Sequence, residues 1–509
     1  MKRNQILEKV HDNKLSIYEA EKMLKDLITG QLQEAKEDKS FLMYFQQEWV
    51  QIDSEPLQST NNYCYLILDT DRSLYNELEK KCEHTGEKVI LAKRGECFQK
   101  ITDTEYIMNP SSFSDYEELL QQVANEISVP DRIINLWGEK QPENNCYILL
   151  YLCQALLKIR DKKIQIINPF KETDTVSDSY NRAVSAIAKT VNIECNKLYI
   201  KTLIYENDSS LFNEIWEEIH SQEEICEIKY QNKLRYIRKL KENKRNTENQ
   251  GKSLLRENGV YIITGGAGKI GTIIAYYLAK KYHASLVLVG RTKNNNFIEK
   301  KISRIAELGV SVQYLSADVT NIEDVKRVVL KTKNQFHKIN GIIQCAGIIK
   351  DSYISNKKIQ DFKQVIDVKV KGTLNMDKVT KNENLDFMAY FSSVSAVTGN
   401  VGQIDYSYAN SFMDNFAEYR NKRVRKKECS GKTISINWPF WKDGGMELSN
   451  NLLRDYQIDF GMKAMSNESA ITVLEHTLRD KIEENQAIVM YGSEKLRSKL
   501  NQMNRSDKK

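Results

Sequence analysis

The stretch VYIITGGAGKIG, residues 260 to 271, decides the fold of this 509-residue chain. Its first four residues are apolar or aromatic, as in a buried strand, and the glycines lead into IIAYYLAKKY, which has the pattern of a helix. Glycines at such a junction permit a tight turn and a close approach of the backbone to a pyrophosphate, and the first turn of the helix attracts negative charge. The stretch therefore predicts a dinucleotide-binding turn, with a plain tight turn as the alternative.

From this turn onward, strand-like and helical patterns alternate. Such an alternation is typical of a parallel sheet with helices on both faces. We therefore expect a complete doubly wound α/β sheet in the C-terminal half. Further strands are predicted within ASLVLVGR (284–291), VSVQYLSADV (310–319), INGIIQCAG (339–347), LDFMAYFSSV (385–394) and KTISINW (432–438).

The N-terminal half shows a second alternation of this kind. Its strand-like runs are CYLIL (64–68), KVILA (88–92), RIINLW (132–137), KIQII (163–167) and LYIKTLIY (198–205). The first run leads into DTDRSLYNELEKK, which has no glycine and places acidic side chains where a phosphate would lie. This half is therefore expected to be Rossmann-like, to hold no cofactor and to be structural. The segment from Tyr236 to Asn258 is expected to be a polar connection with a helical stretch.

Three regions follow from these patterns: residues 1–40, 41–250 and 251–509. The first reads as a helical hairpin, in which Ser16 and Glu19 form a capping box before the second helix. So short a pair of helices cannot bury its apolar stripe alone. It is expected to pack on its own domain, or else to serve as a dimerisation or docking element.

The composition argues against several classes of protein. No run of eighteen apolar residues exists, so no membrane span is expected, and the charged first residues lack a secretory stretch, which favours a cytoplasmic protein. The nine cysteines form no CxxC pair and the six histidines do not cluster with them, so no metal site is expected. The net charge of +6 comes without a base-stacking or groove-reading motif, so nucleic-acid binding is not expected.

The residues after the second strand of the C-terminal half bear on the choice of dinucleotide. NAD-binding folds usually carry Asp or Glu there for the ribose 2′-hydroxyl, but this chain has Gly290 and Arg291. An arginine pairs with a 2′-phosphate, so NADPH is favoured, with a plain surface cation as the alternative. Asp318, which ends the third strand, is placed to meet the adenine edge or to cap a helix.

Three residues further along fit the reduction of a carbonyl group. This reaction needs a hydride donor, a proton donor and a group that makes the proton donor acidic enough. A tyrosine, with an ordinary pKa near 10, serves when a lysine ammonium lies beside it. Tyr406 fits the proton donor, Ser393 the hydroxyl that orients the substrate oxygen, and Lys369 the cation.

The position of the lysine is the most specific signal. Short-chain dehydrogenases ordinarily carry it four residues after the tyrosine, where this chain has Asn410. An asparagine at this position makes the chain resemble the ketoreductase domains of modular polyketide synthases. In those domains the lysine lies on a neighbouring helix, and an asparagine stands four residues after the tyrosine. Lys369, Ser393, Tyr406 and Asn410 match that tetrad, within DVKVKGTLN, FSSVSAVTGNVGQIDYSYAN and INWPFW. The resemblance covers about 45 to 495, because these domains also carry a truncated, cofactor-free Rossmann-like half.

The resemblance implies a set of cofactor contacts at the carboxyl ends of the strands. Lys269 stands where a small residue is commoner, and Pro439, where many relatives have glycine, resembles the subgroup whose acyltransferase acts in trans. The implied contacts are Thr264, Gly265, Gly266, Gly268, Lys269, Ile270, Gly271, Gly290, Arg291, Asp318, Val319, Ala346, Gly347 and Pro439.

The resemblance also implies the product's stereochemistry. Asp351 matches the second aspartate of the LDD motif of B-type ketoreductases, and Gln403 stands where A-type domains carry a tryptophan. A D-configured 3-hydroxyl product is expected, with helix capping as the alternative role of Asp351. Trp441 and Met446 are expected near the acyl chain, before a mobile lid over residues 447–466.

The function implied is the NADPH-dependent reduction of a β-ketoacyl thioester on an acyl carrier protein, beside other polyketide synthase domains. Two alternatives remain open. One is a catalytically silent structural or carrier-docking domain, against which the intact tetrad argues. The other is a reductase or epimerase that acts on a free small molecule, against which Asn410 argues.

Overall fold

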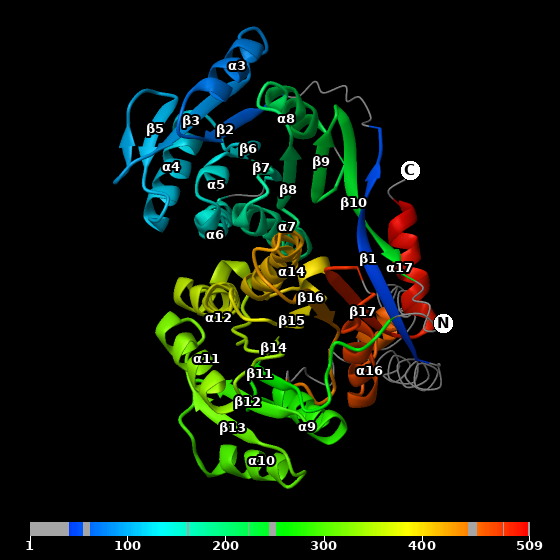
Figure 1. Cartoon of the computed structure of the whole chain (residues 1–509). Helices are drawn as coiled ribbons and strands as arrows, with labels where there is room; N and C mark the ends of the chain where they lie inside the picture. The colour runs from blue at the N-terminus through cyan, green and yellow to red at the C-terminus, as the bar shows by residue number, and fades with distance from the viewer. Residues whose placement is uncertain are drawn as a thin grey trace, which may run out of the picture.

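The computed structural model describes residues 40–53, 62–159, 162–221, 223–243, 251–445, 456–481 and 483–506. The helical hairpin expected over residues 1–40 lies outside these ranges, apart from its last residue. In the part described, seventeen strands join into one sheet that runs through two α/β halves. Figure 1 shows the N-terminal half above and the C-terminal half below, with helices α7 and α14 between them.

The N-terminal half is built on a parallel sheet with the strand order β5-β3-β2-β6-β7-β8-β9. Its central strands are apolar runs buried on both faces, as expected for a parallel sheet covered by helices. The turn after β2 holds the buried Asp69 and contains no glycine. The strands are β2 (Cys64–Leu68), β3 (Lys88–Arg94), β4 (Gln99–Lys100), β5 (Glu105–Met108), β6 (Arg132–Asn135), β7 (Ile164–Lys171), β8 (Leu198–Tyr205), β9 (Glu227–Gln231) and β10 (Leu234–Glu242).

The C-terminal half repeats this topology with the order β13-β12-β11-β14-β15-β16-β17, parallel throughout. Both halves thus contain the doubly wound strand order, which confirms the fold class expected from the sequence. The strands are β11 (Val260–Thr264), β12 (Ser285–Gly290), β13 (Val312–Ser316), β14 (Gly341–Gln344), β15 (Phe387–Ser393), β16 (Lys432–Trp438) and β17 (Gln486–Gly492).

Strand β1 (Phe41–Gln51) connects the parallel strands of the two halves into the one sheet. Its first part pairs antiparallel with β17 and its second part pairs antiparallel with β10. Strand β10 in turn pairs antiparallel with β9. The helical stretch expected after Tyr236 is therefore wrong for residues 236–242, because tertiary pairing places this charged segment between two strands.

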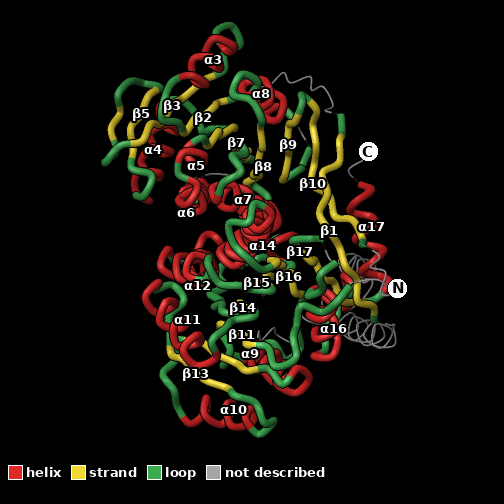
Figure 2. Tube along the Cα trace, in the orientation of Figure 1, coloured by secondary structure: helices red, strands yellow, loops and turns green. Residues whose placement is uncertain are grey.

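Helices cover both sheets, as the tube in Figure 2 shows. The two halves meet where α7 packs on α14, with the Tyr180 and Phe412 rings 4.7 Å apart and Arg182 2.9 Å from Glu418. The α-helices are α3 (Ser73–Cys82), α4 (Phe113–Glu126), α5 (Trp137–Lys140), α6 (Asn145–Leu157), α7 (Val176–Glu194), α8 (Leu211–His220), α9 (Lys269–Tyr282), α10 (Asn296–Ala306), α11 (Ile322–Phe336), α12 (Ile359–Val379), α13 (Ser395–Thr398), α14 (Ile404–Arg425), α16 (Asn467–Thr477) and α17 (Glu494–Ser506).

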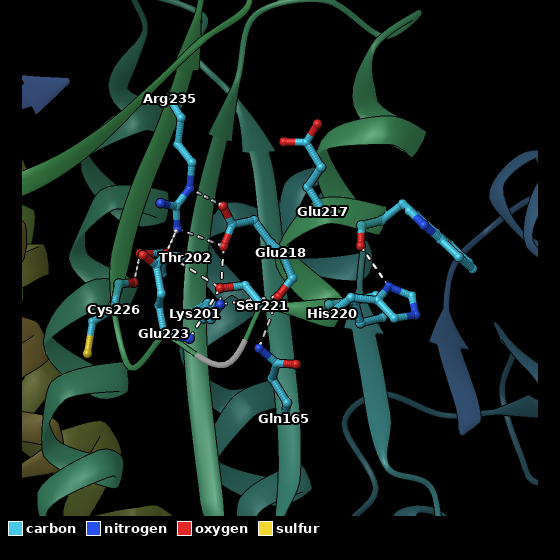
Figure 3. Close-up of polar contacts among 12 residues, drawn as sticks. Gln165, Lys201, Thr202, Glu217, Glu218, His220, Ser221, Glu223, Cys226 and Arg235 are labelled. Atoms are coloured by element: carbon cyan, nitrogen blue, oxygen red, sulfur yellow. Dashed lines mark hydrogen bonds and ion pairs between the residues drawn. The ribbon is translucent and has the colours of Figure 1, made fainter. Parts of the chain in front are cut away.

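A buried charge cluster holds the β9–β10 hairpin to α8 and β8 of the same half (Figure 3). Glu218 of α8 lies 3.1 Å from the Lys201 ammonium of β8 and also binds the guanidinium of Arg235 on β10. All three side chains are almost fully buried. The two cations hold the pKa of Glu218 below its ordinary value although burial opposes this. The cluster explains how a hairpin rich in Lys and Arg joins a hydrophobic sheet.

Among the residues that the structure describes, no helix is long and apolar enough to cross a membrane. The same residues contain no group of three or more His, Cys, Asp or Glu side chains placed to hold a metal ion.

Candidate active site

The glycine turn forms a tight bend between β11 and α9. Gly265 has a φ of +67°, a conformation that favours glycine. A Cβ built on Gly265 would lie 2.9 Å from the backbone nitrogen of Ala346, so the turn also packs too closely for a side chain. Helix α9 begins at Lys269, directly after this turn, so its N-terminal end faces the position expected for a pyrophosphate in folds of this topology. Gly266, Gly268, Ile270 and Gly271 belong to the same turn and the first turn of the helix.

The other expected cofactor residues follow neighbouring strands of the same sheet. Gly290 ends β12 and is followed by Arg291, whose side chain is exposed. Asp318 and Val319 follow β13, and the Asp318 carboxylate accepts a hydrogen bond from the backbone of Thr320 at 2.9 Å. Ala346 and Gly347 follow β14. Because carboxyl ends of parallel strands meet at one edge, these residues and the glycine turn fit a bound dinucleotide.

Lys369 lies beside Tyr406 although the two residues are on different helices. Lys369 projects from α12, and its ammonium lies 5.5 Å from the centre of the Tyr406 ring on α14. The ammonium also donates a hydrogen bond of 2.9 Å to the carbonyl oxygen of Phe391. A Cβ on Gly347 would lie 3.1 Å from Cε of Lys369, so the lysine runs along the small residues after β14.

Burial controls the protonation of both groups. It lowers the pKa of Lys369 to about 8, although Cys345 and Asp414 act in the opposite direction. Burial also raises the pKa of Tyr406, against which the hydrogen bonds of Asn410 and Ser393 act. The sequence led us to expect that Lys369 makes the Tyr406 hydroxyl more acidic. In the structure the desolvation of the phenol outweighs any such effect, and the pKa of Tyr406 lies above its ordinary value.

Ser393 and Asn410 are the other two residues of the expected tetrad. Ser393 ends β15, and its hydroxyl accepts a hydrogen bond of 3.2 Å from the backbone of Ser395. Asn410 is fully buried one turn after Tyr406, and its side-chain nitrogen donates to the Tyr406 carbonyl oxygen at 2.8 Å. Its side-chain oxygen is buried and has no partner in the described part of the chain. That oxygen is therefore free to accept one further hydrogen bond.

The residues expected to control the stereochemistry contact each other. The amide nitrogen of Gln403 donates to the Asp351 carboxylate at 3.0 Å, which joins the loop after β14 to the turn before α14. Trp441 is buried beside Trp438 at 5.2 Å and donates to Asn467 at 2.6 Å, so it is partly a core residue. Met446 and residues 447–455 of the expected lid lie outside the described residues.

A cavity of about 1780 Å³ brings the candidate residues together. The expected site residues that are absent from its lining are Thr264, Gly265, Gly266, Gly268, Lys269, Gly271, Gly290, Arg291, Asp318, Val319, Ala346 and Asn410. Its lining includes Ile270, Gly347, Asp351, Lys369, Ser393, Gln403, Tyr406, Pro439 and Trp441.

Sequence reasoning missed a buried carboxylate next to the tetrad. Asp414 lies on α14 one turn after Asn410 and accepts hydrogen bonds from Ser435 at 2.6 Å and Asn437 at 2.7 Å. Burial raises its pKa to about 6. The helical spacing of Tyr406, Asn410 and Asp414 was the signal that could have identified it.

Comparisons with known proteins agree with this geometry. The KR domain family model matches residues 259–443, and a model described as Beta-ketoacyl synthase-like, N-terminal, matches residues 64–223. Polyketide synthase PksM of Bacillus subtilis (strain 168) is 30% identical over 453 residues, which are 86% of this chain and 10% of PksM. The chain thus spans about a tenth of this curated relative.

Solved structures cover the chain more fully. An N-terminal ketoreductase from the macrolactin assembly line is 26% identical with a TM-score of 0.80, over 98% of this chain and 99% of that chain. A ketoreductase domain from the bacillaene assembly line is 26% identical with a TM-score of 0.70, over 91% of this chain and all of that chain. Both likenesses extend over the N-terminal and C-terminal halves described above.

Proposed function

Because the chain belongs to the ketoreductase domains of polyketide synthases, which are oxidoreductases of the short-chain dehydrogenase type, we propose that it reduces a β-ketoacyl thioester with NADPH. The product is the D-β-hydroxyacyl thioester, and the acyl chain is carried by an acyl carrier protein. The observation that carries the proposal is the Lys369 ammonium beside the Tyr406 ring, supplied by a separate helix while Asn410 occupies the usual lysine position.

The proton comes from Tyr406. When bound, NADPH supplies the hydride that reduces the β-carbon. As negative charge develops on the substrate oxygen, the Tyr406 hydroxyl donates its proton to it and the Ser393 hydroxyl donates a hydrogen bond that orients it. The phenolate that remains is stabilised by the positive charge of Lys369. The unpaired side-chain oxygen of Asn410 holds a water that returns a proton to the phenol.

The preference for NADPH is assigned to Arg291. Its exposed guanidinium follows β12, at the sheet edge where the adenosine ribose lies in dinucleotide-binding folds of this topology. A guanidinium binds a phosphate through two parallel hydrogen bonds, which a 2′-hydroxyl does not match.

The partners are proposed from the relatives. The curated relative PksM is a polyketide synthase, of which the chain spans about a tenth, so we assign the acyl carrier protein and the neighbouring domains as partners. We assign control of the D configuration of the product to Asp351 and Gln403, which are hydrogen-bonded to each other and line the cavity together with Tyr406.

The test is NADPH oxidation with a β-ketoacyl thioester, followed by chiral analysis of the product. We expect a D-hydroxyacyl product, and we expect Tyr406→Phe to lower kcat by about 10²- to 10⁴-fold with NADPH binding unchanged, as for loss of a general acid. Arg291→Ala should reduce the preference for NADPH over NADH. A wild-type protein that never oxidises NADPH would identify a silent structural or carrier-docking domain instead.

A further inference from the structure

The C-terminal end of α7, in the N-terminal half, reaches the active site of the C-terminal half. Glu194 is the last residue of this helix. One of its carboxylate oxygens accepts a hydrogen bond from the backbone nitrogen of Ile354, and the other accepts one from the backbone nitrogen of Gly402 at 2.9 Å. A single side chain thus contacts two segments that are far apart in the sequence.

Both segments border the proposed substrate site. The loop of residues 347–357, here called the Asp351 loop, follows β14, and the turn of residues 399–403 leads into α14 just before Tyr406. They also contact each other, since the backbone nitrogen of Ser352 donates to the Gly402 carbonyl oxygen at 2.9 Å. The hydrogen bond between Gln403 and Asp351 joins them again.

A second residue of the N-terminal half holds the same loop. The side-chain nitrogen of Gln154 on α6 donates to the carbonyl oxygens of Ile354 at 2.9 Å and Lys357 at 2.8 Å. The backbone of Ile354 is therefore bound from the N-terminal half at both its nitrogen and its oxygen. Within the C-terminal half, the Lys357 ammonium forms a buried ion pair of 3.0 Å with Asp405, the residue before Tyr406.

The turn of residues 399–403 packs directly on α7. Gly399 has a φ of +70°, and a Cβ built there would lie 2.8 Å from the backbone of Lys189 and Thr190. The turn therefore packs backbone to backbone against the helix, with no room for a side chain at position 399. The N-terminal half therefore fixes the turn by packing and the Asp351 loop by hydrogen bonds, and Glu194 acts on both.

We propose that Glu194 is a positioning residue of the reductase, which sets the Asp351 loop relative to Tyr406 and thereby the face of the ketone that is reduced. This inference rests on the proposed function. A carboxylate is suited to the task because its two oxygens accept from two backbone nitrogens at once. Small displacements of groups that orient a substrate have large effects on rate, so Glu194, which does not line the cavity, contributes to catalysis through the loop and the turn that it holds.

The experiment compares Glu194→Gln, Glu194→Asp and the matched control Glu118→Gln, an exposed glutamate of α4. In Glu194→Gln an amide nitrogen faces a backbone N–H, so one of the two bonds is lost. We expect kcat/KM to fall about tenfold to a hundredfold and the ratio of D to L product to fall about tenfold, as for misplaced orienting groups. NADPH affinity should stay within about twofold of the wild-type value, because the glycine turn proposed for the pyrophosphate is not one of the two segments that Glu194 contacts.

Glu194→Asp keeps both acceptor oxygens and should restore part of the D to L ratio. An unchanged ratio and unchanged kcat/KM in Glu194→Gln, with an active wild type, would overturn the inference and leave the proposed function intact. A variant with fewer folded molecules but an unchanged product ratio would also overturn it, since a purely structural role lowers yield alone. An inactive wild type would instead refute the proposed function.

Discussion

At the scale of single residues, the site depends on a buried lysine. Lys369 is almost fully buried, and its ammonium has one hydrogen bond, to the Phe391 carbonyl oxygen, in the described part of the chain. Burial disfavours the charged form, which is why the pKa of Lys369 falls to about 8. Tyr406 is also affected by burial, but in the direction that keeps its proton. The two groups therefore titrate in different ranges of pH.

This difference predicts the alkaline limb of the pH profile. Below pH 8 the Lys369 ammonium is charged, and above pH 8 it loses its proton, whereas Tyr406 keeps its proton because its pKa is raised. We expect kcat/KM, which reports the free enzyme, to fall about tenfold per pH unit above pH 8. In Lys369→Arg, whose guanidinium stays charged, the residual activity should not fall until above about pH 10. A wild-type profile that stays flat to pH 9.5 would contradict this.

Sequence alone predicted the candidate residues that lie in recognisable motifs, and the structure brings Lys369, Ser393 and Tyr406 among them to one cavity. The tetrad and the glycine turn are recognisable because each role requires one residue type at a fixed spacing. Asp414 was missed because its helical spacing from Tyr406 and Asn410 does not by itself show that the carboxylate is buried, and Glu194 was missed because it contacts a residue 208 positions away. The net pKa of Tyr406 was also not predictable, because it depends on how much of the phenol the fold buries.

At the scale of elements, the glycine turn shows why one residue type is required. Two different constraints act on glycines in this chain, a positive φ and close packing. Gly265 has both, because its φ is +67° and a Cβ would lie 2.9 Å from the Ala346 backbone. Gly309 has only the first, because its φ is +79° and nothing lies within 4 Å of such a Cβ. Substituting Gly309 therefore measures the cost of backbone strain alone, and substituting Gly265 measures strain together with a steric clash.

We therefore expect Gly309→Ala to lower the free energy of unfolding by about 1 to 2 kcal/mol, the cost of a left-handed conformation. Gly265→Ala should cost more, and it should weaken NADPH binding at least about tenfold, because the Ala346 backbone must move away from the turn. Urea denaturation and a fluorescence titration with NADPH measure the two effects. Equal losses of NADPH affinity in both variants would show that the close packing at Gly265 is unimportant.

The strands that the sequence predicted are those whose own residues form a recognisable pattern. Apolar runs identified the central parallel strands of both halves, because a strand buried on both faces is apolar along its length. Strand β10 was missed: its sequence LRYIRKLKE is rich in charge, and the fold accommodates Arg235 through ion pairs with Glu218 and Glu223. Strand β1 was missed because its partners β10 and β17 lie far away in the sequence.

At the scale of the whole molecule, β1 makes one continuous sheet of two repeated folds. At Phe45 this strand pairs with both neighbours, since Phe45 lies opposite Glu242 of β10 and Ile488 of β17. The ring is 2% exposed and packs in a cluster with Met43, Val397 and Met490. A strand shared in this way, together with the contact of α7 with α14, gives a physical reason for the two halves to unfold as one unit.

The substitution Phe45→Ala tests this coupling between the two halves. Removing a buried phenylalanine costs about 3 to 5 kcal/mol, partly through the cavity that it leaves. If the halves unfold together, hydrogen exchange should show an equal loss of protection in β2 of the N-terminal half and β15 of the C-terminal half, although neither strand contacts Phe45 by backbone pairing. Phe297→Ala, at a side chain 67% exposed, should change neither. A loss confined to the strands of one half would show that β1 is only an edge strand of that half and that the two folds are stable separately.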